Sequence, residues 1–174
     1  MILTVDIGNT QIKLGAWDNN ELAFVSQLQT NILKTNDEYA ANILDVFSLN
    51  GYNRNQFDGA IISSVVPPLS PIIKKAISTV IHSSRIFLVS PNVKTNLVIK
   101  TDVPEALGSD IICSAVAAID KMSLPCIIIS MGTANVIGVI DKEGSFIGAA
   151  FSPGVGVSLE ALSSRTSQLP HISI

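Results

Sequence analysis

The sequence predicts an α/β fold made of two related halves, and three observations lead to this prediction. An apolar run at residues 2–7 ends in the small polar turn Gly8-Asn9-Thr10, and a second run follows at 11–17, which is typical of a β-hairpin. A similar run, turn and run recur at residues 126–141, and such self-similarity indicates a duplicated fold. Between the two hairpins, apolar strands alternate with helical patterns, as in α/β proteins.

In the first half, residues 1–122, the patterns predict the order βββαβαβα. Strands at 2–7, 11–17 and 21–29 form a meander that turns at Asp18-Asn19-Asn20. The pattern Thr35-Asn36-Asp37-Glu38 predicts the cap of a helix at 37–49, with Ala40, Ile43, Leu44 and Phe47 on its buried face. The remaining elements are a buried parallel strand at 60–66, a helix at 69–82, strands at 85–89 and 97–100, and a helix at 104–122.

The second half, residues 123–174, repeats the beginning of this order with strands at 126–130, 134–141 and 145–151, a loop at 152–156 and a helix at 157–165. Counterparts of residues 57–122 are missing from it, so we expect either a truncated chain or a partner that covers exposed strand edges. Two facing hairpins of this kind are the arrangement of the ribonuclease-H-like, actin-like ATPase and sugar-kinase-like fold. We therefore predict duplicated βββαβα halves with the second half incomplete.

The composition argues against several classes of protein. Hydrophobic residues make up 47% of the 174 residues, charged residues 14%, and the net charge is −3, so a packed core is expected and a nucleic-acid surface is not. Cys113 and Cys126 lack metal-ligand spacing and lie in apolar stretches. No disulfide framework is expected from them, which fits a reducing cytoplasm. The chain shows neither a signal-peptide pattern nor a long apolar run, so no membrane association is expected.

The first hairpin carries residue types that suit a phosphate site. Gly8 and Asn9 tolerate positive φ, so their turn can direct backbone N–H groups into one concavity. Asp6 at the strand end suits a hydrated Mg²⁺, and Lys13 can reach phosphate as a point charge. We expect ATP–Mg²⁺ to bind between this hairpin and the one at Gly132-Thr133. The alternative is an ordinary hairpin in which Asp6 merely bonds the turn.

Several short motifs follow one another in a characteristic order. They are Asp6–Lys13 (D-x-G-N-T-x-x-K), Ser63–Pro67 (S-S-V-V-P), Gly108–Ile111 at the place of G-x-D-R, Ser130–Ala134 at the place of D-F-G-T-A, Ser152-Pro153-Gly154, and a last segment from Ser158 through Arg165-Thr166 to Gln168-Leu169-Pro170. By these motifs the chain resembles the type III pantothenate kinases over nearly its whole length. The resemblance implies ATP-dependent phosphorylation of pantothenate, the first step of coenzyme A biosynthesis, by a cytoplasmic homodimer.

The resemblance also implies a role for each matched residue. Asp110 would be the general base for the pantothenate hydroxyl, and Thr133 with Gly132 would contact phosphate. Without the motif, Asp110 reads as a surface carboxylate that favours a helix start. The implied ATP-binding residues of the first hairpin are Asp6, Ile7, Gly8, Asn9, Thr10, Gln11, Ile12 and Lys13. The implied substrate-binding residues are Gly108, Ser109, Asp110, Ile111 and Thr101.

The chain departs from the family pattern at positions that recognise substrate or cation. Ile111 stands where the family has an arginine that grips the substrate carboxylate. Ser130 stands where the family has an aspartate for a monovalent cation, K⁺ or NH4⁺, and Thr101 aligns with a substrate-contacting tyrosine. A later segment with another substrate-contacting threonine has no counterpart. These departures leave three interpretations: a kinase of weak or lost activity, a non-catalytic or regulatory member that binds nucleotide, or a fragment of a longer kinase.

Overall fold

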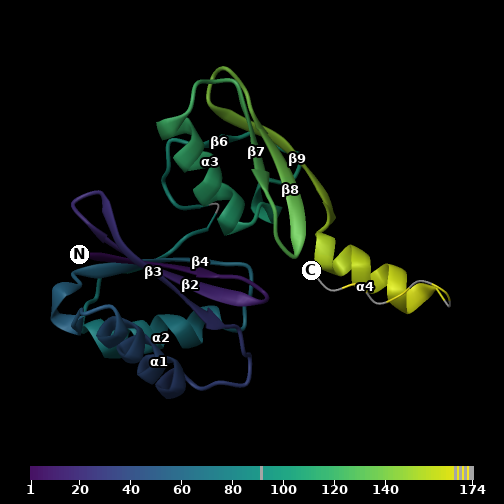
Figure 1. Cartoon of the computed structure of the whole chain (residues 1–174). Helices are drawn as coiled ribbons and strands as arrows, with labels where there is room; N and C mark the ends of the chain where they lie inside the picture. The colour runs from purple at the N-terminus through teal and green to yellow at the C-terminus, as the bar shows by residue number, and fades with distance from the viewer. Residues whose placement is uncertain (91, 167, 169, 171, 173–174) are drawn as a thin grey trace. The chain divides into compact units, whose positions relative to one another are not determined.

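The computed structural model describes residues 1–90, 92–166, 168, 170 and 172 (Figure 1). Leu169 of the last motif lies outside the described residues. The chain divides into two compact units, one comprising Met1–Val93 with Gly108–Asp110 and the other Lys94–Leu107 with Ile111–Ile174. The predicted halves 1–122 and 123–174 are defined by repetition in the sequence, whereas the compact units are defined by contacts between residues. The division into these two halves therefore stays a prediction.

The first unit is built on a five-stranded sheet in the order β3-β2-β1-β4-β5. Its strands are β1 (Ile2–Ile7), β2 (Gln11–Asp18), β3 (Glu21–Gln29), β4 (Gly59–Ser64) and β5 (Ile86–Leu88). The first three form the predicted antiparallel meander, and β4 pairs in parallel with β1 and with β5. The carboxyl ends of β1 and β4 therefore lie at the same edge of the sheet.

Helices α1 (Asn36–Leu49) and α2 (Ser70–Ile81) lie on the same face of this sheet, where they contact each other (Figure 1). Thr35 and Glu38 form the predicted capping box of α1. The predicted buried face of α1 is wrong at Leu44, which is 41% exposed, because Tyr39 and Val46 bury their side chains in its place. Burial of the helix and sheet side chains in one cluster stabilises the unit and fixes the strand ends.

The second unit contains a four-stranded sheet in the order β6-β9-β8-β7. Its strands are β6 (Val98–Ile99), β7 (Cys126–Ser130), β8 (Ala134–Ile140) and β9 (Ser145–Pro153). Strands β7, β8 and β9 form a second antiparallel meander, as the repeated pattern predicts, and β6 pairs in parallel with β9. The unit also holds the short 3-10 helix η2 (Pro104–Ala106), α4 (Val155–Arg165) and most of α3 (Ser109–Lys121).

Two predicted boundaries that lie beside candidate site residues are wrong. The helix predicted at 104–122 is interrupted, because Leu107 is extended after η2 and α3 begins only at Ser109. The loop predicted at 152–156 is shorter, since β9 runs to Pro153 and α4 starts at Val155. Among the described residues, none of the helices combines the length and hydrophobicity that a membrane span needs.

Candidate functional site

The β1–β2 turn is held from both sides by backbone and side-chain hydrogen bonds. The Gly8 N–H donates to the carbonyl of Gln11 at 3.0 Å. The Thr30 hydroxyl donates to the carbonyl of Gly8 at 2.7 Å, and the Thr30 N–H donates to that of Thr10 at 3.1 Å. Thr30 is thus a supporting residue that the motif search missed, because it lies at the end of β3, well outside the motif.

The expected use of positive φ in this turn is wrong. Neither Gly8 nor Asn9 is among the described residues with positive φ, whereas Asn19 and Asn20 of the next turn are. Glycine at position 8 instead allows the backbone of Gln11 to approach closely, since a Cβ there would lie 3.0 Å from the carbonyl oxygen of Gln11. The tight backbone of the turn, rather than a left-handed residue, requires the glycine.

The predicted nucleotide-binding residues of the hairpin divide into two groups. Ile7 and Ile12 form a cross-strand pair and are buried in the core, so they can offer a ligand only backbone groups. Asp6 and Lys13 form the neighbouring pair, with Asp6 half-buried and Lys13 exposed. The other exposed residues of the hairpin are Asn9, Thr10 and Gln11. A carboxylate and an ammonium therefore face the same side at the end of β1.

Asp6 lies beside Ser63 of β4 and is electrostatically coupled to Asp110. The two strands pair in parallel with Asp6 opposite Ser63, and the Ser63 side chain hydrogen-bonds the Asp6 carboxylate. Burial raises the pKa of Asp6 above its ordinary value of 3.8, and the charge of Asp110 raises this pKa further. The Ser63 bond and the Lys13 ammonium oppose this rise in the pKa.

Asp110 is carried to this edge by the first turn of α3. The Ser109 hydroxyl bonds both the backbone N–H and the carbonyl of Ser64, at 2.8 and 3.0 Å. A Cβ at Gly108 would lie 2.5 Å from Oδ1 of Asp110, so glycine leaves the space that this carboxylate occupies. Two carboxylates, a hydroxyl and a lysine from four elements thus gather within the first unit.

This donor set fits a hydrated magnesium ion that is completed by ligand oxygens. Mg²⁺ in phosphate-handling sites keeps several waters and takes one or two protein carboxylates. Asp6 and Asp110 supply two carboxylates whose mutual repulsion a cation would relieve. No group of three or more His, Cys, Asp or Glu side chains with a metal-binding arrangement occurs among the described residues.

In the second unit, the β7–β8 turn is backed by the start of α4. The Gly154 N–H donates to the carbonyl of Thr133 at 2.9 Å. A Cβ at Gly154 would overlap the carbonyl oxygen of Gly132 and lie 2.8 Å from that of Thr133. Because the C=O and the following N–H of a trans peptide point in opposite directions, the N–H groups of Thr133 and Ala134 point away from Gly154. Ser130 is exposed at the end of β7.

Thr101 lines a pocket of about 320 Å³ that lies wholly in the second unit. Most of its wall is apolar, and Lys100 and Asp102 are its charged residues; the remaining lining residues are Val103, Ala106, Leu107, Phe146, Ile147, Gly148, Ala149 and Phe151. Phe146 is fully buried, and glycine at position 138 makes room for its ring. Sequence reasoning found Thr101 but missed the rest of this wall.

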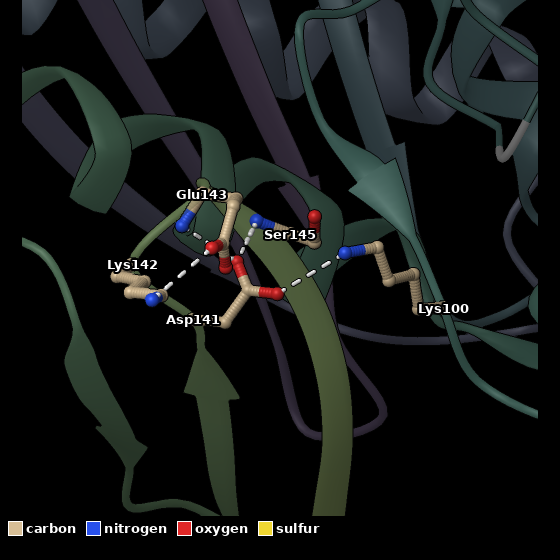
Figure 2. A network of polar contacts seen from close by, with 5 residues as sticks. All are labelled: Lys100, Asp141, Lys142, Glu143 and Ser145. Carbon is tan, nitrogen blue, oxygen red and sulfur yellow. Dashed lines mark hydrogen bonds and ion pairs between the residues drawn. The ribbon is translucent and has the colours of Figure 1, made fainter.

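Lys100 is tied to the β8–β9 hairpin by a polar network (Figure 2). Its ammonium lies 3.3 Å from Oδ2 of Asp141, while Oδ1 of Asp141 accepts the N–H groups of Ser145 at 2.7 Å and Glu143 at 3.0 Å. The N–H of Ser145, then the ammonium of Lys100, holds the pKa of Asp141 below its ordinary 3.8. The network fixes the end of β6, from which Thr101 enters the pocket.

Comparison with known proteins identifies the family. A sequence model of the type III pantothenate kinases matches residues 2–174. The type III pantothenate kinase of Brevibacillus brevis is 38% identical over the whole chain, which spans 68% of that relative, and the enzyme of Geobacter sulfurreducens is 37% identical over the same shares. The chain belongs to the type III pantothenate kinase family. It is therefore of the kinase class, whose members transfer phosphoryl groups.

Solved structures of similar fold extend beyond the type III pantothenate kinases. The activator of 2-hydroxyisocaproyl-CoA dehydratase from Clostridium difficile, solved with bound ADPNP, matches 94% of this chain and 51% of its own with a TM-score of 0.57 and 11% identity. The ethanolamine utilization protein EutJ from Carboxydothermus hydrogenoformans matches 95% and 57% with a TM-score of 0.51 and 14% identity. At these identities the similarity concerns the fold alone, and it confirms the predicted actin-like α/β fold.

Proposed function

We propose that this chain binds Mg²⁺–ATP at the Asp6–Lys13 hairpin and transfers the γ-phosphoryl group to the hydroxyl of pantothenate. The observation that carries the proposal is the pair of carboxylates, Asp6 and Asp110, held at one edge of the first sheet beside Lys13. Asp110 accepts the proton of the attacking hydroxyl, and Lys13 binds phosphate oxygen. A magnesium ion at the carboxylates would neutralise charge on the phosphates.

The second hairpin supports nucleotide binding by its own geometry. Thr133 and Gly132 are proposed phosphate contacts, since the N–H groups of the two peptides that follow Gly132 and Thr133 point away from Gly154. The start of α4 lies against the other side of this turn and holds it through the bond from the Gly154 N–H to the Thr133 carbonyl. The bound ADPNP in the dehydratase activator of similar fold agrees with a nucleotide as ligand.

A coupled assay of ADP release on addition of pantothenate tests the proposal. Asp110→Asn should abolish turnover, because it removes the base, and should only weaken Mg²⁺–ATP binding, because Asp6 and the hairpin remain. Asp120→Asn is the matched control, since Asp120 is exposed on the same helix. Equal rates for the wild type and Asp110→Asn would contradict the assignment of the base.

The pocket that contains Thr101 is the proposed place for part of the acceptor. Its apolar wall suits an aliphatic chain, and the Thr101 hydroxyl supplies a polar contact. Thr101→Val removes the hydroxyl at nearly constant volume, so it should raise the KM for pantothenate while leaving the Kd of ATP unchanged. An unchanged KM would argue against Thr101 as a substrate contact.

Dependence on a monovalent cation is the weakest part of the family pattern here. Ser130 offers one neutral hydroxyl at an exposed strand end, a poorer ligand for K⁺ or NH4⁺ than a carboxylate. We therefore expect the rate in KCl to exceed the rate in NaCl by little. Ser130→Asp should increase the ratio of these two rates if the position retains its cation role.

A non-catalytic, nucleotide-binding member of the family is the second candidate function. It is favoured by Ile111, which is only 8% exposed and places a buried apolar side chain where the family has arginine. The two candidates differ in one outcome. ATP binding by calorimetry without pantothenate-dependent ADP release would favour the non-catalytic protein.

We also propose a homodimer that uses the exposed apolar face of the second sheet. Ile127 and Ile129 of β7, Met131 after it and Ile137 of β8 are 43–75% exposed, and Ile129 pairs with Ile137 across the strands. Exposed apolar patches of this kind mark interaction surfaces. Light scattering should give a dimer mass at tens of micromolar, and Ile129→Lys should reduce it. Leu33→Lys, at an 86% exposed site of the first unit, is the control.

A further inference from the structure

Two serine hydroxyls, with a third beside them, connect the two carboxylate-bearing elements of the first unit. Ser109 at the start of α3 lies 3.1 Å, Oγ to Oγ, from Ser63 at the end of β4. Ser63 in turn bonds the Asp6 carboxylate, and Ser70 of α2 bonds the hydroxyl of Ser64 at 2.8 Å. Ser63, Ser70 and Ser109 are all buried, with 6–9% exposure, so their hydrogen bonds are shielded from water.

The number of available protons sets the direction of these bonds. An ionised carboxylate only accepts, so Ser63 donates its single proton to Asp6. Ser63 then has only lone pairs to offer Ser109. The single Ser109 proton is shared between the carbonyl of Ser64 at 3.0 Å and the oxygen of Ser63 at 3.1 Å, while the Ser109 oxygen accepts the N–H of Ser64 at 2.8 Å. The resulting chain of contacts runs from the Ser64 backbone through Ser109 and Ser63 to the Asp6 carboxylate.

The same Ser109 hydroxyl fixes the start of α3. The helix begins at Ser109 after an extended residue, and the carbonyl of Ser64 also lies 3.0 Å from the Ser109 Oγ. Asp110 is the next residue, and the position of its carboxylate depends on this anchor, since Gly108 on the other side offers no side chain. The Ser109 hydroxyl thereby contacts Ser63, which bonds Asp6, and the backbone of Ser64, which anchors the helix start that carries Asp110.

We propose that Ser109 is a positioning residue that couples the nucleotide-side carboxylate Asp6 to the base Asp110 through Ser63. The proposal rests on the proposed function for the meaning of both carboxylates. Loss of the Ser109 hydroxyl frees the start of α3 and interrupts the chain of contacts to Asp6. A displacement of about 1 Å at a reacting group is enough to lower the rate by about a hundred-fold.

The experiment is a double-mutant cycle in the full chain with Ser63→Ala, Ser109→Ala and both changes together. Two quantities are measured for each variant, namely the Kd of Mg²⁺–ATP by calorimetry and the kcat of pantothenate-dependent ADP release. Ser70→Ala is the matched control, because Ser70 is as buried and hydrogen-bonded to Ser64 but does not contact Ser109. Ser109→Thr restores a hydroxyl and should recover kcat toward the wild-type value.

We expect Ser109→Ala to lower kcat by ten- to hundred-fold, with a melting temperature close to that of Ser70→Ala. The losses of Mg²⁺–ATP affinity in Ser63→Ala and Ser109→Ala should not add, because both interrupt one chain. Additive losses, or a kcat of Ser109→Ala within twofold of wild type, would overturn the proposal. If the wild type shows no turnover, the proposed function fails and the affinity cycle decides the coupling alone. Absence of Mg²⁺–ATP binding by the wild type would overturn both.

Discussion

The N–H of Gly154 donates to the carbonyl of Thr133 at 2.9 Å, and this bond joins the first residue before α4 to the β7–β8 turn. The contact leaves no room for a side chain, since a Cβ at position 154 would overlap the carbonyl oxygen of Gly132. The glycine of the Ser152-Pro153-Gly154 motif is therefore explained by close approach rather than by backbone conformation. Its φ of −67° is one that any residue adopts.

Gly154→Ala should displace the β7–β8 turn and weaken Mg²⁺–ATP binding by roughly ten-fold or more, because Gly132 and Thr133 must move to admit the methyl group. Calorimetric titration with Mg²⁺–ATP measures the effect. Gly156→Ala is the control, since nothing lies within 4 Å of a Cβ there and alanine favours the helix. Equal affinities for the two variants would show that the turn does not contact the nucleotide.

Asp6→Asn should stabilise the free protein at pH 7 while abolishing Mg²⁺–ATP binding. Burial, reinforced by Asp110, raises the pKa of Asp6 in the folded protein, so its ionised form destabilises the fold above that pKa. This penalty disappears as the pH falls through the raised pKa toward 3.8. The urea midpoint of Asp6→Asn should therefore exceed the midpoint of the wild type at pH 7 and match it near pH 3.8. A lower midpoint at pH 7 would contradict the raised pKa.

Asp141→Asn should destabilise the protein at neutral pH and leave its acid stability unchanged. The lowered pKa of Asp141, caused first by the Ser145 N–H and then by Lys100, means that its ionised form stabilises the folded state. The contribution is complete above 3.8 and is lost as the pH falls through the lower folded-state pKa. Thermal unfolding at several pH values should show the two curves converge below pH 3.8. A constant difference across this range would rule out the titration of Asp141 as the cause.

Pantothenate phosphorylation by this chain should be weak. Ile111 cannot form the charge-assisted contact of an arginine, which is worth roughly 1.5–3 kcal/mol, or about ten- to hundred-fold in binding. Ser130 is neutral, so it provides no negative charge to bind a cation. Such a cation would neutralise part of the charge on the transferring phosphoryl group. The double change Ile111→Arg with Ser130→Asp should raise kcat/KM in the coupled ADP assay. Turnover of the unmodified chain at an ordinary kinase rate would refute this prediction.

The sequence by itself determined the parts of this protein that depend on neighbouring residues. The apolar runs and polar turns of residues 2–29 specify a meander of strands, and Thr35 with Glu38 specifies the cap of α1. Both are local because side-chain direction in a strand and hydrogen bonds in a helix repeat over two to four positions. The Asp6–Lys13 hairpin, its repeat near residue 130 and the order of the motifs are likewise local features. They were enough to predict the α/β fold and the family.

Only the tertiary structure decided which of these local features meet. Ser63 and Ser109 are 46 positions apart, and their contact depends on the parallel pairing of β1 with β4 and on where α3 begins. Helical propensity favoured a helix start at Pro104 and could not predict the actual start of α3 at Ser109. That start depends on hydrogen bonds between the Ser109 hydroxyl and the backbone of Ser64, which is distant in the sequence. The same holds for Gly154 and Thr133, where a space too small for one methyl group is set by a strand and a turn that approach each other only in the folded chain.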